Sequence, residues 1–334
     1  MTVVPRRGDR VSPLAGAPAA GRRACWAVVT ALALLASAAP LRARAATPQL
    51  LPARQVQVLA APSPQPFDQP TDVVADAQGF RYVLDGVNDR IVVFDRAGQY
   101  LRAFGQGGKA PGGLRRPVGI GLDPRSRTLL VADTGNGRIT TFTVDGTPGP
   151  LFALPAGERP AGPTDVIVAA GGLRLVVVDN DNHLLRILDR ATGRLLTTTG
   201  GFGETAGKLR HPATVAEGPD GGLYVVDVLG GRVIRYNPDG QQPRQISGWG
   251  TEPGTLFRPK GVAVDRLGRV FVSDSLFGIV QVFDATGKAL GVLAASGKPL
   301  RLAAPTSLTL DDRERLHVVE TRANRVIVLE VRLP

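Results

Sequence analysis

Short runs of apolar residues, each closed by Asp, Gly or Asn, follow one another along most of this chain. Residues 117–142 contain three such runs of four to six residues, separated by brief polar turns. Runs of this length between turn-forming residues are typical of short β-strands joined by tight turns. No segment shows a convincing 3.6-residue hydrophobic period, so we expect almost no helix.

Two landmarks in this pattern recur at a nearly constant interval. A proline opens the first run of each unit and a carboxylate closes the second run, with 46 to 49 residues between successive copies. The prolines are Pro70, Pro117, Pro163, Pro212, Pro259 and Pro305, and the carboxylates are Asp85, Asp133, Asp179, Asp227, Asp274 and Glu320. Because two independent landmarks keep one period, the sequence indicates six copies of one structural unit.

Each unit has room for four antiparallel strands, and its middle strands are apolar on both faces. Sheets that need cover on both faces can stack around an axis as the blades of a propeller, which protects sheet edges by radial repetition. The sixth unit ends after its third strand, and the alternating segment 55–60 can supply the missing fourth. We therefore predict an all-β, six-bladed β-propeller of four-stranded antiparallel blades, closed by an N-terminal strand that completes the last blade.

The beginning of the chain has the pattern of an export signal. Arg22 and Arg23 precede an apolar run at 24–39, and small residues at 43 and 45 flank Arg44. This order predicts a signal peptide at 1–45 with cleavage after Ala45, and the small residues at 36–38 offer a second cut. A retained anchor is the alternative, but the run is shorter than the roughly 20 residues that span a bilayer.

This division gives three segments and changes the meaning of the charge. We expect a linker at 46–53, the propeller at 54–334, no membrane span after cleavage, and a periplasmic or secreted location. The formal net charge is +11, but seven arginines and one aspartate in the leader leave about +5 on the rest. A generic nucleic-acid signal therefore loses most of its support. The only cysteine, Cys25, lies in the leader, so disulfides and cysteine chemistry are excluded from the mature chain.

The second unit carries the most specific motif. Val131-Ala-Asp133-Thr-Gly-Asn136-Gly-Arg138, together with the Pro-x-Gly opening at Pro117 and Pro259, resembles the NHL repeat of six-bladed propellers. The third and fifth units depart from it: Leu184 and Ile279 replace the arginine, and Phe277 replaces the asparagine. The resemblance implies the fold, and its members and relatives include RNA-binding and protein-binding modules, exported proteins without an assigned role, and metal-dependent lyases or lactonases.

Two repeated or scattered sets of polar residues have mainly structural interpretations. The landmark carboxylates occur in every unit, so we expect them to cap turns and to pair with the arginine five residues on, at Arg90, Arg138, Arg232 and Arg325. The three histidines, His183, His211 and His317, occupy different positions in the repeat. We therefore expect them not to converge, which argues against a three-histidine zinc site.

The second residue after each proline is predicted to lie at the mouth of the central channel. It is Asp72, Asp165, Thr214 or Ser307 in four units and glycine, Gly119 or Gly261, in the other two. Their oxygen atoms could bind a hard cation such as calcium, or a polyol; equally, they could only hydrogen-bond neighbouring backbone. Glu217 also breaks the pattern of its position, as a functional carboxylate or through a local register slip.

Basic residues gather in the links that lead to the prolines. We expect them on one face of the disc, around the channel mouth, where a cationic rim attracts anions. The residues predicted to bind through this face are Arg115, Arg116, Arg159, Arg210, His211, Arg258, Lys260 and Arg301.

The sequence thus favours a non-catalytic binding or scaffold protein, monomeric and without a cofactor apart from a divalent cation such as calcium. Its expected partner is an envelope or extracellular protein, an acidic polysaccharide or a phosphorylated head group, and export disfavours RNA. The alternative is a metal-dependent lyase or lactonase at the channel mouth, built on Asp72, Asp165 and Glu217.

Overall fold

A computed structural model describes residues 48–333 of the chain. The signal peptide predicted at 1–45, with its cleavage sites and Cys25, lies outside these residues. The described part contains 27 strands and only three short 3₁₀ helices, η1 (Thr134–Asn136), η2 (Ala170–Gly172) and η3 (Thr321–Ala323). The predicted near-absence of helix is therefore confirmed. None of the helices within residues 48–333 has the length and apolar character that crossing a membrane requires.

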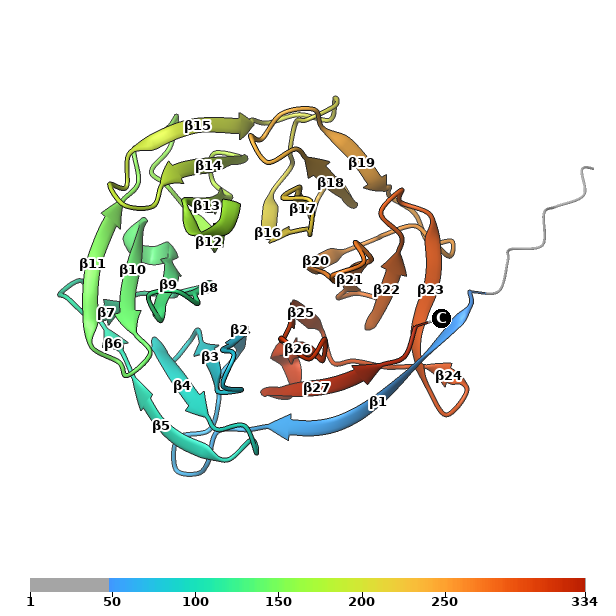
Figure 1. Cartoon of the computed structure of the whole chain (residues 1–334), viewed down its shortest axis with the longest axis horizontal. Helices are drawn as coiled ribbons and strands as arrows, with labels where there is room; N and C mark the ends of the chain where they lie inside the picture. The colour runs from blue at the N-terminus through green and yellow to red at the C-terminus, as the bar shows by residue number, and fades with distance from the viewer. Residues whose placement is uncertain (1–47, 334) are drawn as a thin grey trace, which may run out of the picture. The chain divides into compact units, whose positions relative to one another are not determined.

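Four sheets of four antiparallel strands follow one another along the chain (Figure 1). The first holds β2 (Pro70–Ala75), β3 (Arg81–Asp85), β4 (Arg90–Phe94) and β5 (Tyr100–Phe104). The second holds β8 (Gly119–Asp123), β9 (Thr128–Asp133), β10 (Arg138–Thr143) and β11 (Pro148–Ala153). The third holds β12 (Pro163–Ala169), β13 (Arg174–Asp179), β14 (Leu184–Asp189) and β15 (Leu195–Gly200). The fourth holds β16 (Pro212–Glu217), β17 (Leu223–Asp227), β18 (Arg232–Tyr236) and β19 (Arg244–Ser247).

The other large sheet has nine strands, in which two series of four are joined edge to edge. One series holds β20 (Pro259–Val264), β21 (Val270–Asp274), β22 (Ile279–Phe283) and β23 (Ala289–Ala295), and β24 (Lys298–Pro299) pairs with β23. The second series holds β25 (Pro305–Leu310), β26 (Leu316–Glu320), β27 (Arg325–Val331) and β1 (Leu50–Leu59). The short strands β6 (Gln106–Gly107) and β7 (Gly113–Leu114) pair within the link between the first two sheets. The fold is thus an all-β propeller with four-stranded antiparallel blades.

Strand β1 extends further toward the N-terminus than the sequence predicted. We expected a strand at 55–60 after a linker at 46–53, but β1 begins at Leu50. Residues 50–52 pair in parallel with 292–294 of β23, and the rest of β1 pairs antiparallel with β27. Leu51 is buried in the core beside these strands. Two flanking strand edges therefore order a segment that looked like a linker, and the predicted pairing of the N-terminal strand with the last strand is confirmed.

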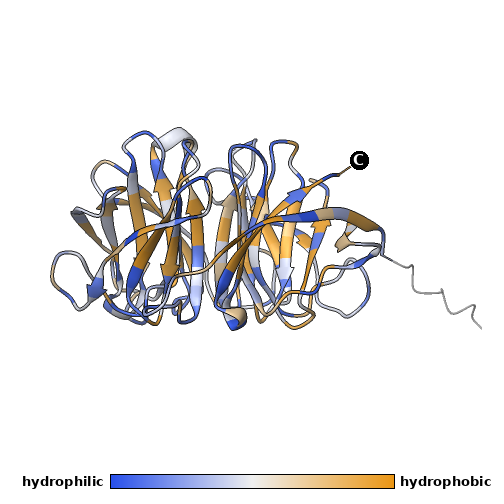
Figure 2. Ribbon diagram, turned by 90° about the horizontal axis from the view of Figure 1, so that it is seen from below, coloured by the Kyte–Doolittle hydropathy of each residue, from blue (hydrophilic) through white to orange (hydrophobic). Residues whose placement is uncertain are grey.

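The hydrophobic core lies between neighbouring sheets. The first strand of each series lies nearest the centre of the ring in Figure 1, and the later strands lie progressively further out. Tyr82 and Ile91 of the first sheet, for example, pack with Ile120 and Val131 of the second. Each middle strand is covered on both faces, which explains its apolar sequence, and full burial of one such side chain contributes about 1.5–3 kcal/mol. Figure 2 shows the consequence: hydrophobic strands with mostly hydrophilic loops at the two ends.

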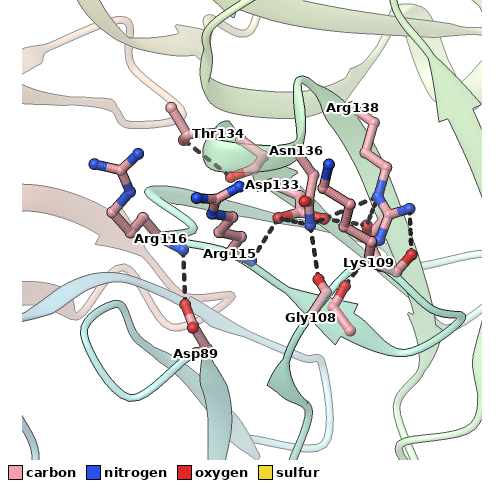
Figure 3. A network of polar contacts seen from close by, with 12 residues as sticks. Asp89, Gly108, Lys109, Arg115, Arg116, Asp133, Thr134, Asn136 and Arg138 are labelled. Atoms are coloured by element: carbon pink, nitrogen blue, oxygen red, sulfur yellow. Dashed lines mark hydrogen bonds and ion pairs between the residues drawn. The ribbon is translucent and has the colours of Figure 1, made fainter.

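The landmark carboxylates fix the link that precedes each proline. Buried Asp133 accepts hydrogen bonds from the backbone N–H of Arg115 at 2.8 Å and from Nε of Arg138 at 2.9 Å (Figure 3). The Nη atoms of Arg138 donate to the carbonyl oxygens of Lys109 and Gly113 in the same link. The predicted pairs are confirmed in four units, as Arg90–Asp85, Arg138–Asp133, Arg232–Asp227 and Arg325–Glu320.

The two units that lack this arginine use a different residue for the same task. Arg186 donates from Nε to Asp179 at 2.8 Å. Gln281 donates from Nε2 to the carbonyl of Thr255 at 2.6 Å, and its Oε1 accepts the N–H of Gly254 at 3.0 Å. Each lies two residues beyond the missing arginine, on the same face of its strand because strand side chains alternate. The link is therefore held in these units as well.

Candidate functional site

The end of the ring that carries the landmark prolines and the links before them, here called the proline face, contains a cavity of about 440 Å³. Its entrance is lined by the first residue after each proline, which differs from the position that the sequence predicted. These residues are Thr71, Val118, Thr164, Ala213, Lys260 and Thr306. The wall also includes Asn180, His211, Leu229, Arg258 and Thr321. We call this space the proline-face cavity.

A second cavity, of about 350 Å³, opens toward the other end of the ring. Its lining includes Asp76, Glu217 and Asp312, and no lysine or arginine among the described residues. Glu217 pairs with Leu223 just as Ala75 at the same repeat position pairs with Arg81. A register slip, which we considered from the sequence, therefore does not account for this glutamate.

The four residues predicted at the channel mouth lie deeper, between the two cavities. Asp72, Thr214 and Ser307 line both cavities, and Asp165 lines the far one. Asp72 and Asp165 are each only 6% exposed and Ser307 is 5% exposed. The predicted position is thus wrong by one residue, because the first strand runs inward along the axis and its second residue is already below the entrance.

Hydrogen bonds from these four residues connect neighbouring sheets. Asp72 accepts the backbone N–H of Ile120 at 2.7 Å and the hydroxyl of Ser307. Asp165 accepts the N–H of Val215, and Thr214 donates to the carbonyl of Lys260, both at 2.8 Å. These contacts match the alternative that the sequence left open, hydrogen bonding to neighbouring backbone.

Glycine occupies the same position where the neighbouring sheet comes too close for a side chain. A Cβ at Gly119 would lie 2.5 Å from the carbonyl oxygen of Thr164. At Gly261 it would lie 2.9 Å from Cα of Ser307. The alternation of polar residues and glycines around the channel therefore follows from packing between sheets.

The two buried aspartates have unusual acidities. Burial raises the pKa of Asp72 to about 6 against donors that would lower it, the Ser307 hydroxyl first. Burial, and then the charge of Asp72, raise the pKa of Asp165 well above its ordinary value. Buried carboxyl groups with raised pKa values in a channel are recurrent features of functional sites, although structural networks also produce them. Within residues 48–333, no three His, Cys, Asp or Glu side chains lie together in a way that could hold a metal ion.

The predicted basic residues lie in the links at the proline face, but they differ in their surroundings. The backbone N–H groups of Arg115 and Arg116 are bound by Asp133 and Asp89, and Figure 3 shows their guanidinium groups extending away from these contacts. Arg210 forms an ion pair with Glu204 at 2.5 Å, and Arg301 donates to the carbonyl of Phe277 at 3.1 Å. Arg159 is exposed in the link before Pro163.

Arg258, Lys260 and His211 are the predicted basic residues that line the proline-face cavity. Arg258 and Lys260 also line an adjoining cavity of about 580 Å³, together with Arg322. Burial, and secondarily the charge of Arg258, lower the pKa of Lys260. The basic rim is thus concentrated beside the blade that begins at Pro259.

Two of the three histidines meet, contrary to the prediction. The rings of His183 and His211 are 4.8 Å apart between centroids and nearly perpendicular. The backbone N–H of His211 donates to Nδ1 of His183 at 3.3 Å. His183 lies in the turn after β13 and His211 in the link before β16, and both turn and link are at the proline face. His317 is buried elsewhere, where Nε of Arg81 donates to its Nε2 at 3.4 Å.

Two exposed aromatic residues on the proline face were missed by the sequence reasoning. Phe202 is 69% exposed and Trp249 is 66% exposed, each at the centre of a Gly-x-Gly link. The ring of His183 lies 5.0 Å from that of Phe202, and the ring of Phe257 lies 5.6 Å from that of Trp249. The signal was present in the sequence as an aromatic residue at the same place in two consecutive links.

Comparison with curated proteins gives two relatives, although no family model matches the chain. NHL repeat-containing protein 3 of Mus musculus is 26% identical over 201 residues, which are 55% of this chain and 56% of that protein. The protein of the same name from Homo sapiens is 32% identical over 100 residues, 27% of this chain and 28% of that protein. The chain therefore spans about half, or less, of the length of the curated relatives it matches.

Solved structures show the same fold at low sequence identity. A gluconolactonase from Xanthomonas campestris is 20% identical with a TM-score of 0.60, over 86% of this chain and 98% of that one. Virginiamycin B lyase from Staphylococcus aureus is 14% identical with a TM-score of 0.59, over 80% of this chain and 82% of that one. Likeness at this level concerns the fold alone. Together with the repeat landmarks, these comparisons support the assignment of the chain to the NHL-repeat propeller family.

Proposed function

We propose that this chain is an exported, monomeric six-bladed propeller that binds an anionic macromolecule through its proline face. The six blades are the four separate sheets and the two series joined by β1. The partner class is an acidic polysaccharide or an acidic surface of an envelope or extracellular protein. The leader-like pattern at 1–45 supports export to the periplasm or beyond, which disfavours RNA as a ligand.

One observation carries this proposal: cations without a carboxylate partner are gathered on one face. Within residues 48–333, Arg258, Lys260 and Arg322 form no ion pair, whereas the arginines of the repeat motif are paired in four units. Exposed Trp249 and Phe202 lie in links at the same end of the ring. Arginine and aromatic residues are the types that most often carry binding energy at interfaces.

Charge reversal tests the proposal on a heparin column. The protein with Arg115, Arg116, Arg210 and Arg258 changed to Glu should lose retention, because each change replaces attraction by repulsion. The matched control changes four exposed arginines at the opposite end of the ring to Glu: Arg96, Arg125, Arg194 and Arg313. Equal retention of both variants would show that net charge, and not the proline face, governs binding, and would end the proposal.

A second candidate function is a metal-dependent lyase or lactonase in the channel, built on Asp72, Asp165 and Glu217. The likeness in fold to a lyase and a gluconolactonase supports it, as do the raised pKa values of the two aspartates. The fit to a metal is poor, because backbone N–H groups already occupy oxygen atoms of Asp72 and Asp165. Calcium would be the ion such oxygen ligands favour. Purified protein without a divalent ion, whose melting does not change on adding calcium, would exclude this candidate.

A further inference from the structure

The proline-face cavity has one strongly cationic side. Arg258 and Lys260 flank Pro259 at the start of β20, and both line this cavity and the adjoining one. Asp72 and Asp68 are the carboxylates among the lining residues of the two cavities. Asp72 already accepts three hydrogen bonds, and Asp68 is on the exposed side of the adjoining cavity. The cation pair is therefore available to an anionic group of a ligand.

The hydroxyl groups around the cavity direct their protons toward the protein. Thr164 donates to the carbonyl of Ala213 at 2.9 Å, Thr214 donates to that of Lys260 at 2.8 Å, and Ser307 donates to Asp72. A hydroxyl has one proton to donate and two lone pairs to accept. These side chains can therefore offer a ligand only acceptor positions.

The threonine pair shared by both cavities follows the same rule. Thr321 donates to the carbonyl of Pro70 at 2.8 Å, so it must be the acceptor in its 2.7 Å contact with Thr306. Thr306 consequently spends its own proton on Thr321. Its remaining lone pair is available to a donor from a ligand in either cavity.

His211 adds an acceptor for a related reason. Nδ2 of Asn180 donates to the carbonyl of Pro212 at 2.7 Å, which identifies Oδ1 as the atom facing His211. Nδ1 of His211, 3.2 Å from that oxygen, is then the protonated nitrogen of the neutral ring. Nε2 of the neutral ring therefore carries the lone pair. The wall opposite the cations thus presents acceptors from several blades.

A ligand that complements this cavity must bring a negative charge for one side and hydroxyl donors for the other. We propose that the cavity binds the carboxylate-bearing sugar at the end of an acidic polysaccharide, with the carboxylate at Arg258 and Lys260. This rests on the proposed function and specifies its ligand. The cavity of about 440 Å³ lies within the range of small-molecule sites. The adjoining cavity, which shares Arg258, Lys260, Thr306 and Thr321, gives the next sugar a place.

Small probes test whether charge and hydroxyl groups are both required. Isothermal titration of the protein is carried out with glucuronate, with glucose and with acetate. We expect glucuronate to bind at least about tenfold more tightly than either of the others, since each of them satisfies only one side of the cavity. Binding of acetate or glucose as tight as that of glucuronate, or no binding of glucuronate, overturns the inference. Tighter binding of glucose 6-phosphate overturns the assignment of the anion as a carboxylate.

Variants locate the binding. Lys260→Gln and Arg258→Gln should each weaken glucuronate binding at least about tenfold, and Thr306→Val should weaken glucuronate binding while leaving acetate unchanged. The control is Arg194→Gln, an exposed arginine at the opposite end of the ring, which should bind like the original protein. Unchanged melting temperatures show that the variants fold. If none of the cavity variants weakens binding, the site is elsewhere and the inference is wrong.

The outcome is distinguishable from failure of the proposed function. If glucuronate does not bind but heparin retention still depends on the proline face, the face binds polyanions and only the cavity assignment is lost. If retention does not depend on that face either, both proposals are lost.

Discussion

At the residue scale, the same carboxylate chemistry serves two different purposes in this protein. Asp133 and its equivalents are buried, but each has an arginine, a glutamine or several backbone N–H groups around it, as Asp274 shows with the N–H groups of Phe257 and Arg258. Removing one partner of a buried pair of this kind typically costs about 3–5 kcal/mol. Asp72 and Asp165 are equally buried but have no cation among their hydrogen-bond partners within residues 48–333. Their negative charge is therefore a cost to the folded state.

This cost predicts a pH dependence of stability. The pKa of Asp72 is raised from 3.8 to about 6, so the folded protein keeps this proton to a higher pH than the unfolded chain does. Stability is then lost as the pH rises from about 4 through 6. A difference of two pKa units corresponds to about 3 kcal/mol. Asp72→Asn cannot titrate, so its unfolding free energy should fall less between pH 4 and pH 7, by an amount on the order of 3 kcal/mol.

Urea unfolding at several pH values measures this difference. Comparison with the unchanged protein removes the contributions common to both. These include Asp165, and also His317, whose depressed pKa of about 4 acts in the opposite direction. Asp145→Asn is the control, because that side chain is 83% exposed and its ion pair with Arg102 is long, at 3.6 Å. An Asp72→Asn slope equal to that of the control would contradict the proposed cost of the buried charge.

At the scale of elements, β1 connects the beginning of the described chain to its end. The sequence predicted a linker at 46–53, and the structure places Leu51 in the core with 1% of its surface exposed. Leu51→Ala should therefore destabilise the protein by about 2–5 kcal/mol, as for other buried leucines. Thermal or urea unfolding measures the effect. The neighbouring Leu50, which is 37% exposed, provides the control as Leu50→Ala. Equal small effects of both substitutions would mean that the segment behaves as a linker in solution.

The elements themselves were largely predictable, because their signals are local and repeated. Each proline–carboxylate landmark marks the start of one strand and the end of the next, and Pro70 pairs with Asp85 in the sheet. The substitutes Arg186 and Gln281 were not predicted, since the repeat alignment fixes the position of the arginine but not the reach of a side chain two residues on. The same limit applies to His183 and His211, whose separate loops come together only at the proline face.

The candidate site was predicted in part for a similar reason. The period placed the first strands at the channel and the links at one end, which gave Arg258, Lys260 and His211 correctly as neighbours of the channel entrance. It did not give the depth of Asp72 and Ser307, which depends on how far each strand runs inward. Nor did it reveal which cations lack partners, because that depends on contacts between links and turns of different blades.

At the scale of the whole molecule, the two ends of the channel differ in charge. The proline-face cavity has Arg258, Lys260 and His211 in its wall, while Asp76, Glu217 and Asp312 line the far cavity. A field with this direction favours the approach of an anion from the proline face. Exposed rim charges act over a distance that salt shortens, from about 10 Å at 0.1 M to about 3 Å at 1 M.

Salt should therefore separate the contribution of the rim from that of the cavity. Heparin retention, which depends on many exposed arginines, should be lost steeply between 0.1 M and 1 M sodium chloride. Glucuronate affinity should fall less over the same range, because partly buried charges such as Lys260 are screened less than exposed ones. Reversal of Arg115 and Arg116 should reduce the salt dependence of heparin retention and leave glucuronate binding unchanged, since neither residue lines the cavity. Column elution at a series of salt concentrations, with calorimetry of glucuronate in the same buffers, measures both. Equal salt dependence of the two ligands would show that rim and cavity act as one electrostatic surface, and the division between them would have to be abandoned.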